Sequence, residues 1–226
     1  MLRVAHTSDL HLDDRERGIR MLRRVIATAE AAEARVLVLA GDIFDHNRVS
    51  LGTLDAVTRV FGDAAMDIVI LPGNHDCLGL DSVYRRGGIA APRNVHVLGV
   101  TSDDTLDLEA HDLSVWGRAH AEYRDMNPLR DPSPRLRRHH IAVAHGHWVT
   151  GPEDLHRSWL LHHDDLESVD ADYIALGHWD RAVHLDSVPV PTFYSGSPDL
   201  ARSINLVALG SERTWVERLA LLPEGG

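Results

Sequence analysis

Six short segments carry polar residues of the kinds that bind metal ions or shape the turns around them. In chain order they are Asp9-Leu10-His11, Gly41-Asp42-Ile43-Phe44-Asp45, Gly73-Asn74-His75-Asp76, His145-Gly146-His147, Gly177-His178-Trp179-Asp180 and Ser195-Gly196-Ser197-Pro198. The first, second, third and fifth directly follow apolar runs, and strand ends are where side chains converge on one site. The pattern predicts a two-metal hydrolase, in which a bridging hydroxide attacks phosphorus while the cations neutralise the equatorial oxygens.

The residue types favour some metals over others. Mixed carboxylate, amide and imidazole ligands suit Mn, Fe, Zn or Co better than Ca or a thiolate-seeking ion, and we expect two divalent ions, with Mn preferred. Asp9 and His11 are one residue apart and fall on the same side of an extended strand end. Asp42 ends a buried run and needs a compensating partner. Each segment alone has an ordinary explanation, a surface acid or a polar turn, but their joint occurrence favours the metal site.

The first half of the chain alternates strands and helices. Strands are predicted over 2–8, 34–40 and 66–71, and helices over 18–32 and after the N-cap candidate Ser50. This alternation indicates a parallel sheet with helices packed against it.

The second half is mostly β. Strands are predicted over 95–98, 112–117, 140–144, 172–176, 181–185, 191–195, 203–209 and 214–221. A helix is expected only near 153–163, a terminal hairpin around 210–212, and a long exposed loop over 121–138. Two sheets packed face to face with helices outside are the expected architecture.

Composition narrows the classes of protein. At 226 residues and 44% hydrophobic the chain can bury one core, and we expect one domain over 1–226. The net charge of −11 disfavours strong non-specific attraction to DNA. The lone cysteine, Cys77, excludes an internal disulfide. With no signal peptide and no membrane-length apolar run, a cytoplasmic location is expected.

These motifs resemble the calcineurin-like metallophosphoesterases from Asp9 to Ser197. The resemblance implies a four-layer α/β/β/α sandwich, with two mixed β-sheets flanked by helices and the dimetal site at the strand ends. Within that family the motifs look most like the phosphoesterase domain of SbcD/Mre11-type DNA exonucleases. Those proteins continue into a capping region and segments that clasp an ATPase partner, and no separate capping domain is expected within this sequence.

The resemblance also implies roles for individual residues. One metal is expected to be held by Asp9, His11, Asp42 and Asp180, and the other by Asp42, Asn74, His145 and His178. His75 is expected to assist the leaving group or stabilise the transition state, with Asp76 orienting it. Contacts behind the metal ligands or with the substrate are expected for Asp45, His46, Arg48 and His147, although for His147 a plain surface position is an equal alternative.

Position 180 departs from the family pattern, because the motif usually ends in histidine and here ends in Asp180. Aspartate is a competent oxygen ligand, and we expect it to bind the first metal. The alternative is that the shorter side chain falls back and that metal binds weakly.

Three functions are weighed. The leading one is hydrolysis of a phosphodiester, in a nucleic acid or a nucleotide. The second is a stand-alone phosphatase or phosphodiesterase for small phosphorylated metabolites, which fits the acidic charge and the missing extension better. The third is a non-catalytic interaction module, which the near-complete ligand set disfavours. The oligomeric state does not follow from the sequence.

Overall fold

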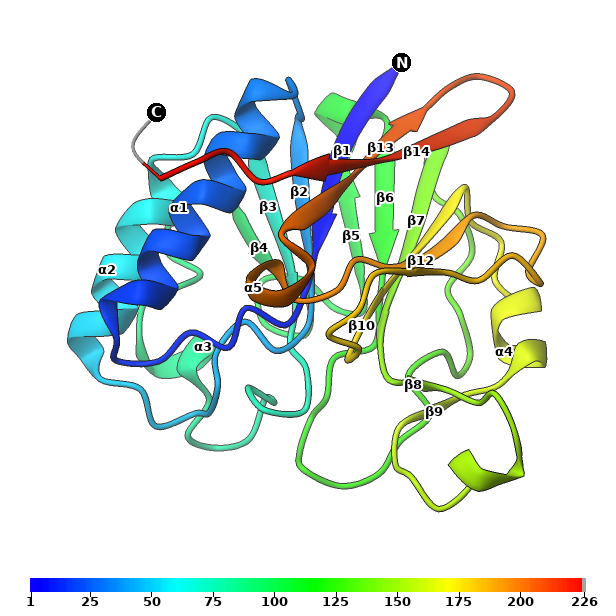
Figure 1. Cartoon of the computed structure of the whole chain (residues 1–226), viewed down its shortest axis with the longest axis horizontal. Coiled ribbons are helices and arrows are strands. Elements are labelled where there is room, and N and C mark those ends of the chain that lie inside the picture. The colour runs from blue at the N-terminus through cyan, green and yellow to red at the C-terminus, as the bar shows by residue number, and fades with distance from the viewer. Residues whose placement is uncertain (225–226) are drawn as a thin grey trace.

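The computed structural model describes residues 1–224 and contains two six-stranded mixed β-sheets packed face to face (Figure 1). The first sheet has the order β14-β13-β1-β2-β3-β4 and the second has the order β11-β12-β10-β7-β6-β5. The strands of the first sheet are β1 (Leu2–Thr7), β2 (Val36–Ala40), β3 (Asp67–Leu71), β4 (Val95–Val97), β13 (Ser203–Leu209) and β14 (Thr214–Ala220). Those of the second are β5 (Thr105–Leu108), β6 (Leu113–Trp116), β7 (His139–His145), β10 (Tyr173–Gly177), β11 (Val183–His184) and β12 (Thr192–Tyr194).

The central strands β2 and β3 of the first sheet are buried on both faces, as their continuous apolar runs predict, whereas the edge strand β14 is largely exposed. In β2, Leu37 and Leu39 pack toward the helices, whereas Val36 and Val38 pack between the two sheets. The helices α1 (Glu16–Ala31) and α2 (Leu51–Gly62) cover the outer face (Figure 1). The Ser50 hydroxyl accepts a hydrogen bond from the backbone N–H of Thr53, which confirms Ser50 as the N-cap of α2.

The outer face of the second sheet carries only a thin layer. The short helix α4 (His163–Glu167) lies there, and loop residues such as Leu129 and Val188 complete a third apolar cluster. The predicted α/β class, with two mixed sheets flanked by helices, is confirmed.

One sequence-based helix is wrong. The segment 153–163 holds a 3-10 turn (Pro152–Asp154), the strand β9 (Leu160–Leu161) and the start of α4. Strand β9 pairs with β8 (His147–Trp148), and the Asp154 carboxylate accepts hydrogen bonds from the backbone N–H and hydroxyl of Thr150. These tertiary contacts override the local helical pattern.

Two further predictions from the sequence, the loop over 121–138 and the terminal hairpin, are confirmed. Segment 121–138 has no helix or strand, and β13 and β14 form the terminal hairpin. The strand β5 and the short helices α3 (Val83–Arg86) and α5 (Pro198–Ala201) were not anticipated. Within residues 1–224 no helix combines the length and apolarity that a membrane crossing requires.

Strand direction decides where the polar segments meet. Strands β1, β2 and β3 run parallel to one another, as do β7 and β10. Their carboxyl ends lie at the same edge of the sandwich, the lower edge in Figure 1, so the segments that follow them come together there.

Candidate metal centre

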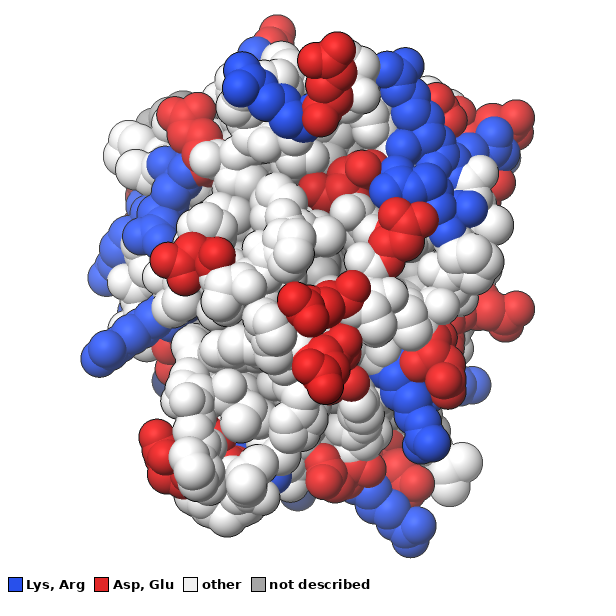
Figure 2. Space-filling view, turned by 90° about the vertical axis from the view of Figure 1, so that its right-hand side faces the viewer, with Lys and Arg blue, Asp and Glu red and all other residues white. Residues whose placement is uncertain are grey.

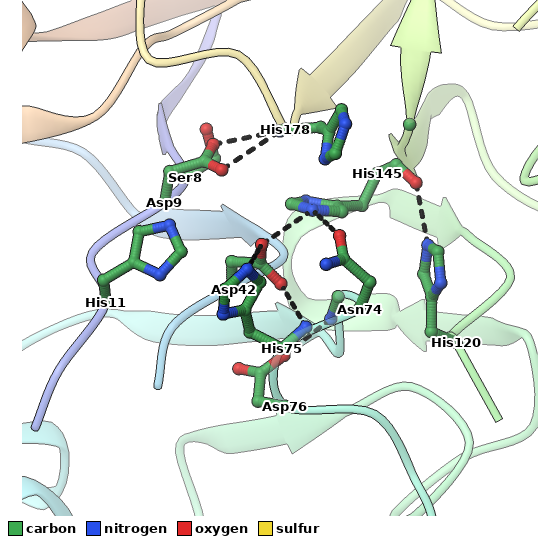
Figure 3. Close-up of polar contacts among 12 residues, drawn as sticks. Ser8, Asp9, His11, Asp42, Asn74, His75, Asp76, His120, His145 and His178 are labelled. Atoms are coloured by element: carbon green, nitrogen blue, oxygen red, sulfur yellow. Dashed lines mark hydrogen bonds and ion pairs between the residues drawn. The ribbon is translucent and has the colours of Figure 1, made fainter. Parts of the chain in front are cut away.

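Asp42 is the common member of two side-chain groups that could each hold a cation. One group is His11, Asp42 and His75, and the other is Asp42, His145 and His178; in each, ligand atoms lie within 4.8 Å of one another. These side chains come from the ends of five strands and point toward one another in Figure 3. The arrangement offers two adjacent ion positions that share one carboxylate, as a dimetal centre requires.

Unusual backbone conformations turn these side chains inward. Asp9, His11, Asp42 and His178 all have positive φ, with values of 54°, 46°, 53° and 100°. A non-glycine residue in this region costs about 1–3 kcal/mol, and such residues concentrate at functional sites. Four of them in one cluster indicate that the fold holds this geometry against local preference.

Glycine at position 41 is required by a close approach. A Cβ atom there would lie 2.1 Å from Nδ1 of His145, and Gly41 has φ of +89°. Only glycine accommodates both constraints. Its presence lets the His145 imidazole pack directly behind Asp42.

His145 is oriented by the backbone. Its Nδ1–H donates to the carbonyl oxygen of Ala40 at 2.9 Å, which leaves Nε2 facing Asp42 Oδ2 at 3.1 Å and Asn74 Oδ1 at 3.0 Å. Burial lowers the pKa of His145, but the charge of Asp42 and the hydrogen bond to it outweigh burial and raise the pKa to about 9. A proton and a divalent cation therefore compete for the same nitrogen.

Asp9 adds a second buried carboxylate. It is 2% exposed and accepts a hydrogen bond from the backbone N–H of His178 at 3.0 Å. Burial raises the pKa of Asp9; the His145 charge opposes this shift and the Asp42 charge adds to it. Two buried carboxylates side by side call for a positive charge between them.

The donor set fits divalent cations. Carboxylate, imidazole and amide atoms converge, and the buried Nδ1 of His11 lies 3.3 Å from Oδ1 of Asp45 without hydrogen-bond geometry among residues 1–224. A buried nitrogen that lacks a well-formed hydrogen bond is costly unless a ligand satisfies it. The residues present are therefore suited to a metal centre.

His75 stands at the mouth of the centre and is 44% exposed. Its Nδ1 lies 2.8 Å from the carbonyl oxygen of Asp45, which can only accept, so Nδ1 carries the hydrogen. Its Nε2 faces the centre, 4.0 Å from Asp42 Oδ2. Nε2 is thus the atom from which a proton could reach a substrate.

The expected orienting role of Asp76 is corrected. Its carboxylate accepts hydrogen bonds from the backbone N–H groups of Ile43, Phe44 and Gly73 and from the Tyr84 hydroxyl. Within the described chain no hydrogen bond joins it to the His75 ring; the Asp45 carbonyl orients that ring instead. Asp76 ties the second motif to the third, and burial raises its pKa.

The structure does not bring Asp180 to either group. After His178 the chain turns Trp179 inward, where its ring stacks on Tyr194 at 4.5 Å. Asp180, the next residue, is exposed and lines a separate hollow with Arg181 and Arg218. This position favours the alternative, in which the shorter side chain falls back from the metal.

The residues expected behind the metal ligands or in contact with the substrate lie in two different places. Asp45, His46 and Arg48 line a hollow next to Asn74 and His75.

His147 is on the other side and is 8% exposed, so the surface alternative is wrong. It accepts a hydrogen bond from Nε1 of Trp179 at its Nδ1, and its Nε2 lies 3.1 Å from Asp154. It therefore braces the loop that carries His178.

The sequence-based assignment missed His120. It is fully buried, donates from Nε2 to the carbonyl oxygen of His145 at 2.8 Å, and its ring lies edge-on to Trp159. Burial lowers its pKa to about 4, so it is neutral at pH 7. No local motif marks this residue, and only the pairing of distant loops identifies it.

Known proteins share this sequence pattern and fold. The sequence profile described as calcineurin-like phosphoesterase matches residues 2–181. The uncharacterized metallophosphoesterase YhaO of Bacillus subtilis is 27% identical, over 87% of this chain and 53% of its own length. The SbcD component of the nuclease SbcCD of Bacillus subtilis is 22% identical, over 96% of this chain and 69% of its own.

The chain thus spans about half the length of YhaO. Among solved structures, TT1561 of Thermus thermophilus superimposes with a TM-score of 0.61 at 11% identity, covering 96% of this chain and 98% of that one. At that identity the likeness concerns the fold.

Proposed function

The chain belongs to the calcineurin-like phosphoesterase family, and on that premise we propose that it is a dinuclear-metal phosphodiesterase. The observation that carries the proposal is the position of Asp42 between two ligand groups that share it. Divalent cations bound there would offset charge on the phosphate oxygens and make water a stronger nucleophile.

The proposed ligands follow the geometry. The first ion would be held by Asp9, His11 and Asp42. The second would be held by Asp42, Asn74, His145 and His178. Mn is the proposed metal, because mixed oxygen and imidazole ligands without thiolate suit it.

Two hollows favour a diester over a monoester. One, of about 620 Å³, is lined by Asn74 and His75, and the other, of about 270 Å³, is lined by Asp9 and His11. A phosphate held at the centre would have one hollow on each side. A diester has two substituents and can fill both, whereas a monoester fills only one.

Arg48 supports an anionic substrate. Its side chain is exposed in the larger hollow, and no carboxylate within residues 1–224 forms an ion pair with it. By contrast, Arg15 and Arg17 beside the smaller hollow pair with Asp13 and Asp199. An unpaired guanidinium near the centre can contact a phosphate oxygen.

A small phosphodiester or nucleotide is the proposed substrate class rather than long DNA. The net charge is −11. On the face drawn in Figure 2, which is the right-hand side of Figure 1 rather than the edge that carries the centre, Arg side chains gather near the edges and Asp and Glu side chains lie among uncharged residues. A nuclease acting with an ATPase partner is the second candidate, motivated by the likeness to the SbcD component of SbcCD.

The test is Mn-dependent hydrolysis of an aryl phosphodiester beside the matching monoester, with Asp42→Asn as the inactive control. We expect preference for the diester. Preference for the monoester would contradict the two-hollow argument, and steep salt-sensitive binding of DNA would favour the nuclease.

A further inference from the structure

The two hollows beside the metal centre are not equivalent. The larger one, of about 620 Å³, falls within the range of roughly 300–1,000 Å³ typical of small-molecule sites. The smaller, at about 270 Å³, falls just below it. If the proposed function holds, one hollow receives the group that leaves and the other receives the group that stays on phosphorus.

His75 distinguishes the two sides. Its Nδ1–H is committed to the carbonyl oxygen of Asp45, and its Nε2 points to the centre from the wall of the larger hollow. When water oxygen bonds to phosphorus, the bond to the leaving oxygen breaks and its electron pair stays on that oxygen. His75 in its cationic form, with hydrogen on both ring nitrogens, gives its Nε2 proton to the leaving oxygen and becomes neutral while Nδ1–H is kept; solvent takes the proton lost by water and returns one to Nε2. The leaving oxygen must therefore lie on the side of the larger hollow.

Tyr123 lines that hollow and exposes 64% of its surface. Its hydroxyl nevertheless lies 3.5 Å from Nδ2 of Asn47. Asn47 is 7% exposed and is itself fixed, because it donates to the carbonyl of Cys77 and accepts from the backbone N–H of Val83. The ring is thus anchored at its tip while its faces stay open.

An anchored, exposed aromatic ring is a preformed stacking surface, because little side-chain freedom is lost when a flat group packs on it. Single exposed aromatic residues are common and need no explanation. Here, however, the fully exposed Leu80 lines the same hollow, so two apolar side chains border the space that faces His75.

We propose that the larger hollow receives the leaving group and that Tyr123 selects a planar aromatic leaving group by stacking against it. Tyr123 is then a specificity-determining residue of the proposed phosphodiesterase, and this inference rests on that function. The chemical class of substrate is a phosphodiester with a nucleobase-like or aryl group on the side that departs.

The test uses one mixed diester that carries a phenyl group and a hexafluoroisopropyl group, two leaving groups of similar acidity. The ratio of phenol to fluoroalcohol released reports which group occupies the larger hollow. We expect the wild-type protein with Mn to release mainly phenol. In Tyr123→Ala the ratio should move about tenfold toward fluoroalcohol, since stacking on an aromatic side chain contributes about 1–3 kcal/mol.

Two variants separate stacking from disturbance of the loop. Tyr123→Phe keeps the ring but loses the hydroxyl contact with Asn47, so the ratio should move in the same direction as in Tyr123→Ala and by less. Leu136→Ala changes an exposed side chain in the same 121–138 loop, outside the residues that line the hollow, and should leave the ratio unchanged.

A ratio that is the same in wild type and Tyr123→Ala overturns the inference while hydrolysis itself upholds the proposed function. Because the ratio is internal to one substrate, a general loss of activity does not move it. A wild-type protein that cleaves neither bond overturns both.

Discussion

The Asp42 carboxylate lies 3.1 Å from Nε2 of His145, and both residues are almost completely buried. They come from different sheets, since Asp42 follows β2 and His145 ends β7. Their contact joins the two halves of the sandwich at the metal centre. The remaining proposed ligands are arranged around this pair.

Replacing Asp42 with Asn should weaken binding of both ions, because the same carboxylate belongs to both ligand groups. Loss of a group that merely supports a ligand costs about 10–100-fold in affinity or activity, so a shared ligand should cost at least about 100-fold. Titration calorimetry with Mn measures the affinity. Asp63→Asn, at the exposed end of α2, is the matched control, and equal Mn affinity in the two variants would contradict the assignment.

Replacing His75 with Asn should slow hydrolysis in a way that depends on the leaving group. A positioned general acid contributes about 10²–10⁴-fold, most of it when the leaving oxygen is strongly basic. We therefore expect a larger loss of kcat for a phenyl diester than for a 4-nitrophenyl diester. His46→Asn in the same hollow should alter KM without this dependence; a uniform loss in the His75 variant would argue against proton donation.

Replacing Asp180 with Ala should leave Mn affinity within about threefold, since removal of a true supporting contact would cost about tenfold or more. The reason is that Asp180 is exposed and lines a separate hollow with Arg181 and Arg218. Isothermal titration of the variant beside wild type makes the comparison. A loss comparable to that in His178→Asn would restore Asp180 as a ligand.

Replacing Gly177 with Ala should destabilise the fold. A Cβ atom there would lie 1.8 Å from the carbonyl oxygen of Ala40, so β10 and β2 would have to separate. Overpacking of this kind typically costs about 1–3 kcal/mol in the free energy of unfolding. Urea unfolding measures it. Gly52→Ala in helix α2, whose Cβ would meet nothing closer than 3.9 Å, should change stability by at most about 1 kcal/mol.

Lowering the pH should reduce the free energy of unfolding, partly because His6 binds a proton more readily in the unfolded chain than in the folded one. Burial lowers the pKa of this fully buried imidazole from 6.5 to about 3. Between those values the unfolded chain binds one more proton than the folded one, so the contribution of His6 is fully present above pH 6.5 and is lost as the pH falls toward 3.

The expected size is about 1 kcal/mol between pH 6 and pH 5, because one pKa unit corresponds to about 1.4 kcal/mol. His6→Asn should remove this part of the pH dependence, whatever its effect on overall stability. Urea unfolding at both pH values tests it, with exposed His163→Asn as the control. Parallel pH profiles for wild type and His6→Asn would rule out the contribution.

The residue pattern alone determined much of this protein. Apolar runs ending in Asp, Asn and His placed the polar segments at strand ends, and the parallel strands then brought Asp42, Asn74 and His145 together as expected. Local chemistry sufficed here because a buried strand must pair, and the carboxyl ends of parallel strands share one edge.

Only the tertiary structure decided the contacts between segments. It turned Asp180 away once Trp179 had stacked on Tyr194, committed Asp76 to backbone amides rather than to His75, and brought His120 behind His145. It also replaced the helix expected near 153–163 with a strand that pairs with β8. Neighbouring residues in the sequence do not encode these outcomes, because each depends on which distant backbone group or ring is available as a partner.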